Sequence, residues 1–154
     1  MAVRVTDQRS PTGGGTDRIE GLRVLYAEDH PSLQRAVGKL LQAYGASVAS
    51  AHDGLEATER ALAEPFDLVL MDLRMPRMDG FDAARALRAG GCPVPLVAVT
   101  ADATPEVRAH AIAAGFDAVL AKPFDIGDLI HALELVREAA SVVSRAAGRY
   151  SSPA

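Results

Sequence analysis

Short apolar runs alternate along this chain with segments in which apolar residues recur at helical spacing. Five runs predict β-strands, and they lie at residues 23–27, 46–51, 66–72, 95–101 and 117–121. A segment of helical periodicity follows each of them, at residues 31–45, 53–64, 80–90, 104–115 and 125–148. The chain therefore repeats strand then helix five times.

Residues at the ends of the helical segments support this division. Pro31 suits a first helical turn, and Gly45 suits the position just past a helix end. Thr104 is a predicted N-cap, and Asp125 is another, with Asp128 three residues further on. The last helix would be longer than the short strands of the sheet require.

The strand segments at 68–71 and 96–99 are apolar on both faces, which is typical of a parallel sheet covered on both sides. Right-handed crossovers between such strands give a doubly wound domain. We therefore expect an α/β fold with a five-stranded parallel sheet in the order 2-1-3-4-5 and a long last helix.

Composition indicates one soluble domain with tails. Of the 154 residues, 49% are hydrophobic and 23% are charged, and the only cysteine, Cys92, excludes an internal disulfide. We expect a flexible N-terminal tail at residues 1–20, a folded domain at 21–138, and an extension of the last helix with a disordered tail at 139–154.

Charge and hydropathy narrow the expected partners and location. The net charge of −4 offers no overall field for nucleic acid. No apolar stretch approaches the roughly 18 residues that a membrane span needs, and the N-terminus lacks the apolar core of a signal peptide. We expect a cytoplasmic protein with no nucleic acid or membrane partner.

Chemistry-bearing residues stand at the carboxyl ends of four predicted strands. Glu28 and Asp29 follow the first strand, Asp72 ends the third, Thr100 ends the fourth, and Lys122 follows the fifth. The second strand ends in nothing comparable. Function collects at this edge of an open parallel sheet, so these groups should share one pocket.

Three carboxylates around one lysine predict a divalent cation. Two like charges about 4 Å apart repel by about 4 kcal/mol at an effective dielectric near 20. Mg²⁺, which favours carboxylate oxygens, would relieve this repulsion. Asp72 would then be a nucleophile facing an anionic electrophile, which fits phosphoryl transfer.

The sequence resembles the receiver domain of two-component response regulators over residues 22–136. The motifs that carry the resemblance are Glu28–Asp29, "LVLMDLRMPRMDG" around Asp72, "VAVTA" around Thr100 and "AKPF" around Lys122. The resemblance implies a flavodoxin-like fold and a phosphoryl group donated by a histidine kinase or histidine phosphotransfer protein. It also implies that the chain catalyses only its own phosphorylation and dephosphorylation.

The resemblance assigns roles to individual residues. Asp72 would be the phosphoryl acceptor. Asp29 and Asp72 would hold Mg²⁺ together with the backbone carbonyl of Arg74, while Glu28 would act through water.

Other roles implied by the resemblance concern the phosphoryl group itself. Thr100 and Lys122 would grip its oxygens, and small Ala101 would leave room for it. The Lys122–Pro123 bond would be cis, which a prolyl amide allows at little cost. We also hypothesise that Arg74 and Asp102 pair across the site and slow hydrolysis of the acyl phosphate.

One position departs from the family pattern. Receivers usually carry a tyrosine or phenylalanine three residues before the lysine, and here that residue is Val119. A β-branched side chain has little freedom to swing. The switch should then run through Thr100, Lys122 and the fourth helix, with a modest rearrangement of residues 100–108.

Several alternatives remain at this stage. The chain could be a stand-alone receiver or part of a hybrid kinase, and its output could be a protein target or a homodimer formed through the fourth helix, fifth strand and last helix. It could also be a pseudo-receiver that is never phosphorylated. A haloacid-dehalogenase-like phosphatase would want an aspartate where Arg74 stands, and a flavin module would want a phosphate-binding loop after the first strand.

Overall fold

A computed structural model describes residues 19–150 of the chain, and the side chains of residues 19–138. Of the segments predicted as tails, at residues 1–20 and 139–154, residues 1–18 and 151–154 lie outside the described residues. Ile19 was expected in the flexible tail, but its side chain is fully buried in the core. Gly21 then donates its N–H to the carbonyl of Gly45 at 2.9 Å, so the folded part begins about two residues earlier than predicted.

Five parallel strands form one sheet in the order β2-β1-β3-β4-β5, which confirms the predicted fold. The strands are β1 Arg23–Ala27, β2 Ser47–Ala51, β3 Leu68–Asp72, β4 Leu96–Thr100 and β5 Ala118–Ala121. The helices are α1 Pro31–Ala43, α2 Gly54–Ala63, α3 Gly80–Ala89, α4 Pro105–Ala114 and α5 Ile126–Tyr150.

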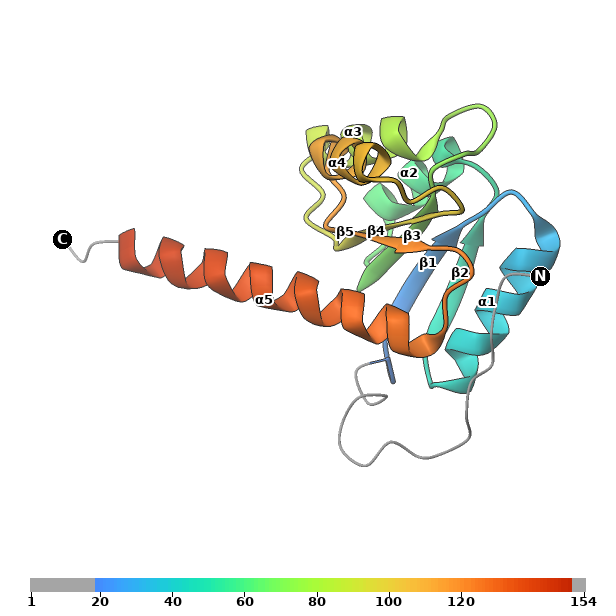
Figure 1. Ribbon diagram of the computed structural model, residues 1–154, viewed down its shortest axis with the longest axis horizontal. Helices are drawn as coiled ribbons and strands as arrows, with labels where there is room; N and C mark the ends of the chain where they lie inside the picture. The colour runs from blue at the N-terminus through green and yellow to red at the C-terminus, as the bar shows by residue number, and fades with distance from the viewer. Residues whose placement is uncertain (1–18, 151–154) are drawn as a thin grey trace.

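Helices cover both faces of the sheet (Figure 1). Strand residues alternate between the two sides: Val24 and Tyr26 pack with α1 and α5, whereas Leu25 and Ala27 pack with α2, α3 and α4. This two-sided burial accounts for the unbroken apolar runs in β3 and β4, where every residue is buried.

Helix α5 has 25 residues and extends well past the edge of the sheet (Figure 1). Its start is fixed by a reciprocal cap, in which Asp128 N–H donates to Asp125 at 2.8 Å and Asp125 N–H donates to Asp128 at 3.0 Å. Within the described part of the chain, no helix has the length and apolarity to cross a membrane.

Two glycines allow close backbone contact at the carboxyl edge of the sheet. A Cβ on Gly54 would lie 2.3 Å from the carbonyl oxygen of Met78, and a Cβ on Gly80 would lie 2.5 Å from that of Asp72. The start of α2 and the start of α3 therefore both press against the β3–α3 loop, residues 73–79.

Candidate functional site

The parallel sheet brings the carboxyl ends of β1, β3, β4 and β5 to one edge, where a cavity of about 460 Å³ opens. Its lining comes from four segments that are distant in sequence, at the carboxyl ends of these four strands. The lining residues are His30, Asp72, Arg74, Thr100, Ala101, Asp102 and Lys122. The structure thus gathers most of the predicted site residues around one space.

The ammonium of Lys122 lies between two buried carboxylates. Its Nζ donates to Glu28 Oε1 at 2.7 Å and to Asp72 Oδ2 at 2.8 Å. Glu28 is fully buried and Asp72 is 6% exposed, so neither charge is stabilised mainly by bulk water. A buried carboxylate without a partner would be costly, and this ammonium supplies one hydrogen bond to each.

The pKa values reflect this crowding. Burial raises the pKa of Glu28, the hydrogen bond from Lys122 lowers it in part, and the nearby charge of Asp72 raises it again, with a net shift upward. Burial alone would lower the pKa of Lys122, but its hydrogen bonds to Asp72 and Glu28 outweigh this and raise it. Lys122 therefore remains a cation, and the pocket remains short of positive charge.

Two residues that sequence reasoning missed hold Glu28 in place. The Tyr26 hydroxyl donates to Glu28 Oε1 at 3.2 Å. Gln34 on α1 donates through Nε2 to the backbone carbonyl of Glu28 and, at 3.0 Å, to that of Ala51. Tyr26 and Glu28 are two residues apart on one strand and its extension, so the period of a strand could have indicated their contact. Nothing in the sequence distinguishes Gln34 from other polar residues of α1.

Burial also raises the pKa of the Tyr26 phenol, and the adjacent Glu28 carboxylate raises it further. The phenol is therefore a neutral hydrogen-bond donor to Glu28.

Asp29 contributes an oxygen that no hydrogen bond satisfies. Its Oδ1 is buried without a hydrogen-bond partner, although His30 Nδ1 lies 3.2 Å away in a poorly aligned position. The same imidazole lies 3.3 Å from Glu28 Oε2, and the hydrogen bond to Glu28 and the charge of Asp29 raise the pKa of His30. A buried acceptor of this kind calls for a cationic partner.

The donor set fits a hard divalent cation, because it offers carboxylate oxygens in excess of cationic side chains. Ligand atoms of Glu28, Asp29 and His30 lie within 4.8 Å of one another. The predicted ligand set of Asp29, Asp72 and the backbone carbonyl of Arg74, with Glu28 acting through water, shares Asp29 and Glu28 with this cluster and stays a prediction.

Hydrogen bonds between residues two positions apart order the two loops that border the cavity. Arg74 N–H donates to Asp72 Oδ1 at 3.0 Å, and Asp102 N–H donates to Thr100 Oγ1 at 3.1 Å. Across the cavity, Arg74 Nη2 lies 3.7 Å from Asp102 Oδ2. Both side chains are more than half exposed, so the pair itself contributes little to stability.

Lys122 is set by backbone geometry as well as by its ion pairs. Its N–H donates to the carbonyl of Thr100 at 2.8 Å, and the Lys122–Pro123 peptide bond is cis. Thr100 lines the cavity and is only 3% exposed.

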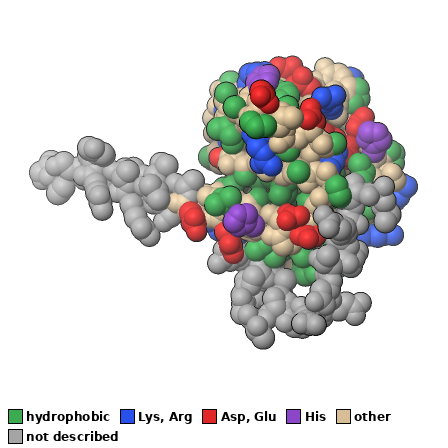
Figure 2. All heavy atoms as spheres, in the orientation of Figure 1, with side chains coloured by type: hydrophobic (Ala, Val, Ile, Leu, Met, Phe, Trp, Pro, Cys, Tyr) green, Lys and Arg blue, Asp and Glu red, His purple; other side chains and the backbone are tan. Residues whose placement is uncertain are grey.

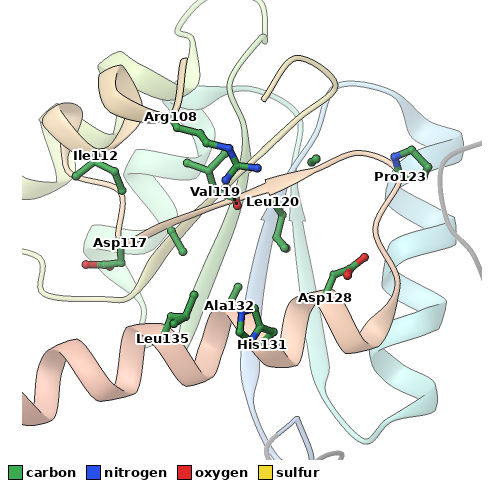
Figure 3. A pocket seen from close by; sticks show the side chains of 12 residues that line it. Arg108, Ile112, Asp117, Val119, Leu120, Pro123, Asp128, His131, Ala132 and Leu135 are labelled. Atoms are coloured by element: carbon green, nitrogen blue, oxygen red, sulfur yellow. Dashed lines mark hydrogen bonds between the residues drawn. The ribbon is translucent and has the colours of Figure 1, made fainter. Parts of the chain in front are cut away.

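Val119 borders a second hollow of about 560 Å³ between α4, β5 and α5 (Figure 3). Arg108 on α4 extends over β5, donating at 3.3 Å to the carbonyl of Val119 and at 3.2 Å to that of Ala103 in the β4–α4 loop. Acidic, basic and apolar side chains are mixed over the face that carries α5 (Figure 2). Arg108 therefore connects the loop after Thr100 to β5, a link that the sequence did not reveal.

The receiver-domain family model matches residues 24–134. The chain therefore belongs to the response regulator receiver domain family of two-component systems.

Curated relatives include both response regulators and kinases. The chain is 42% identical over 127 residues to the transcriptional regulatory protein PdtaR of Mycobacterium tuberculosis, covering 80% of this chain and 62% of that protein. It is 32% identical over 150 residues to histidine kinase 1 of Arabidopsis thaliana, covering 73% of this chain and 12% of the kinase. The chain thus spans less than two thirds of the length of either relative.

Solved structures show the same fold. The receiver domain of the Pseudomonas aeruginosa sensor histidine kinase PA1611, solved with a magnesium ion in its active site cleft, has a TM-score of 0.68 and 34% identity, covering 75% of this chain and 98% of that one. The chemotaxis response regulator CheY4 of Vibrio cholerae has a TM-score of 0.68 and 32% identity, with the same coverage.

Proposed function

We propose that this chain is a working phosphoacceptor: Asp72 takes a phosphoryl group from a phosphohistidine of a histidine kinase or histidine phosphotransfer protein. The observation that carries the proposal is the contact of 2.8 Å between Lys122 Nζ and Asp72 Oδ2 at the base of an open cavity. A purely structural ion pair would have no need of a cavity or of the additional unsatisfied carboxylate oxygen of Asp29.

In the proposed reaction, a carboxylate oxygen of Asp72 attacks phosphorus and the phosphorus–nitrogen bond breaks. The bonding electron pair stays on the imidazole nitrogen of the donor, and Asp72 becomes an acyl phosphate. Lys122 then has a new anionic partner, and the Thr100 hydroxyl lies where it could donate to a phosphoryl oxygen. The chain would catalyse no reaction other than its own phosphorylation and the hydrolysis that reverses it.

A bound Mg²⁺ would neutralise charge on the phosphoryl oxygens and on the carboxylates. The residues that would hold it are Asp29, Asp72 and the backbone carbonyl of Arg74, with Glu28 acting through water. The unsatisfied oxygen of Asp29 supports this assignment.

We propose that phosphorylation changes a protein-interaction surface through Thr100, Lys122 and α4. A phosphoryl group adds about −1.5 to −2 charges and three acceptor oxygens. If Thr100 turns toward it, Thr100 gives up the hydrogen bond from Asp102 N–H, and the Arg108 link to Ala103 and Val119 carries the change to β5. The output surface would be α4, β5 and α5, used for a protein target or a second copy of the chain.

The direct test is incubation with Mg²⁺ and acetyl phosphate followed by intact-mass measurement. Wild type should gain the mass of one phosphoryl group, and Asp72→Asn should gain none. Asp79→Asn is a matched control in the same loop, because Asp79 is the N-cap of α3 and asparagine caps equally well. A wild-type protein that stays unmodified, with or without a kinase partner, would support the pseudo-receiver instead.

A second measurement tests the path of the switch. Chemical-shift changes on phosphorylation should extend through residues 100–108 to α4. Changes confined to the loops around Asp72 would contradict the proposed path.

A further inference from the structure

The β3–α3 loop contains an unusual backbone conformation at Arg77. Its φ of 64° is the only positive φ of a non-glycine residue in the described part of the chain. The N–H of Met78 donates to the carbonyl of Pro76 at 2.7 Å, which closes a tight three-residue turn around Arg77. Side chains with a Cβ adopt this conformation rarely, so other contacts must hold it.

The contact that holds the turn comes from the connection between β2 and α2. Arg77 Nε donates to Asp53 Oδ2 at 2.7 Å, and the Asp53 side chain is only 7% exposed. Asp53 lies just after β2, the strand at whose end the sequence predicted no functional residue. Its other oxygen accepts the N–H of Glu56 at 2.8 Å, so the carboxylate is fixed as the N-cap of α2.

A second contact joins the same two segments. Gly54 N–H donates to the carbonyl of Met78 at 3.0 Å, one residue after Arg77. The tip of the β3–α3 loop is thus attached at two adjacent points to the start of α2, while its other end begins at Asp72. Arg74 lies between these two ends, three residues before Arg77, so a displacement of the tip would shift its backbone.

We infer that Arg77 and Asp53 are positioning residues for Mg²⁺ binding: their ion pair holds the β3–α3 loop in its left-handed turn and so fixes the backbone at Arg74. This inference rests on the proposed function, since that function assigns the Arg74 carbonyl to the metal. Neither residue touches the cavity itself.

Four variants distinguish the effect of the Arg77–Asp53 ion pair from the effect of the backbone conformation at residue 77. Arg77→Ala removes the ion pair but keeps a Cβ in the left-handed turn, whereas Arg77→Gly removes the pair and also the conformational penalty. Asp53→Asn keeps the N-cap and weakens the pair. Arg85→Ala is the matched control, because it removes an exposed arginine whose contacts, with Asp82 on the same helix and with His110 on α4, lie outside the β3–α3 loop.

Two readouts are measured on the full chain. Isothermal titration with Mg²⁺ alone should show binding about five- to tenfold weaker in Arg77→Ala and Asp53→Asn, and within about twofold of wild type in Arg77→Gly and Arg85→Ala. Hydrogen exchange of the Gly54 amide, measured without Mg²⁺, should be faster in Arg77→Ala and Asp53→Asn and unchanged in Arg85→Ala.

The phosphorylation rate with acetyl phosphate adds a third, dependent readout. In Arg77→Ala, saturating Mg²⁺ should restore the rate to within about twofold of wild type, because the variant lowers metal affinity and leaves the phosphoryl acceptor intact.

The outcomes distinguish this inference from the function on which it rests. Wild-type affinity in Arg77→Ala, or equal weakening in the alanine and glycine variants, would overturn the positioning role alone. A wild-type chain that binds no Mg²⁺ and gains no phosphoryl group would overturn the proposed function and the positioning role together.

Discussion

The two edges of the sheet differ in how well their acidic side chains are supplied with hydrogen-bond donors. At the amino ends of the strands, two aspartates accept backbone hydrogen bonds: Asp67 from the N–H of Arg23 at 2.8 Å, and Asp117 from the N–H of Leu96 at 2.8 Å. At the carboxyl ends, Glu28 and Asp72 share the ammonium of Lys122, and Asp29 Oδ1 has no hydrogen bond.

Arg88 shows how hydrogen-bonding groups are paired at the amino ends of the strands. Its guanidinium donates to the carbonyls of Gly115, Cys92 and Val94 at 2.8–3.0 Å and to Asp117 at 2.9 Å. This one side chain connects the end of α3 to the starts of β4 and β5, and its donors meet acceptors of fitting number and geometry.

The comparison separates groups that stabilise the fold from groups that serve chemistry. Polar groups at the amino ends lower the free energy of the folded state by satisfying the backbone. Those at the carboxyl ends raise it, because buried like charges repel. Substitutions at the first end should therefore cost stability, and substitutions at the second should cost phosphorylation.

The largest expected effect is on phosphorylation, in Lys122→Ala. Loss of a positioned cation that stabilises transition-state charge typically costs about 10²–10³ in rate, or about 3–4 kcal/mol. The rate is measured from intact mass over time with acetyl phosphate and saturating Mg²⁺. A rate within tenfold of wild type would show that Lys122 is only a structural partner of Asp72.

Arg88→Ala is expected to lose stability and to keep its phosphorylation rate. Three carbonyls and one carboxylate lose a charged donor, so the free energy of unfolding should fall by about 2–3 kcal/mol, measured by urea denaturation. The phosphorylation rate should stay within about twofold of wild type. Arg85→Ala, which removes exposed contacts with Asp82 and His110, should change the free energy of unfolding by no more than about 0.5 kcal/mol. A large loss of phosphorylation in folded Arg88→Ala would contradict the division between residues that stabilise the fold and residues that support phosphorylation.

A smaller, pH-dependent effect is expected at Asp53. The N–H of Glu56 and the guanidinium of Arg77 hold the pKa of Asp53 below its usual value. A depressed pKa gives stability that is present above the unfolded pKa and lost as the pH falls through the folded one. Asp53→Asn should thus be about 1 kcal/mol less stable near neutral pH, discounted for the exposure of Arg77.

Urea denaturation of wild type and Asp53→Asn at a series of pH values measures this difference. It should shrink as the pH falls below about 4. A difference that stays constant down to acid unfolding would mean that the charge of Asp53 contributes nothing.

The smallest expected effect concerns the lifetime of the acyl phosphate in Arg74→Ala. The Arg74–Asp102 pair at 3.7 Å is exposed, so its removal should shorten the lifetime only about twofold, or about 0.4 kcal/mol. The lifetime is followed by intact mass after removal of the phosphodonor. If Arg74→Ala and wild type decay at the same rate, the pair does not shield the phosphate.

Sequence patterns were sufficient for the sheet and for the residues at four strand ends. Periodicity sets which strands are buried on both faces, and parallel strands place their carboxyl ends together, so Asp72, Thr100 and Lys122 could be assigned to one edge. The partition of their hydrogen bonds could not be predicted, because it depends on which carboxylate the Lys122 side chain reaches.

The end of β2 was the clearest failure. Asp53 fell in the predicted helical segment at residues 53–64 with no role assigned to it. Its contact with Arg77 joins residues 24 positions apart through side-chain conformations that no periodicity encodes. The same holds for Arg108 and Gln34, whose partners are backbone carbonyls of other elements. Backbone acceptors are present at every residue, so the sequence does not indicate which of them a long polar side chain will meet.

The close backbone contacts at Gly54 and Gly80 have a consequence for protein engineering. Neither glycine position has space for a Cβ against the β3–α3 loop, so the loop cannot be transferred to another protein by itself. Grafting residues 73–79 onto another parallel scaffold would require importing both glycines and the turn that precedes α2, since a host with any larger residue at either place would displace the transplanted segment.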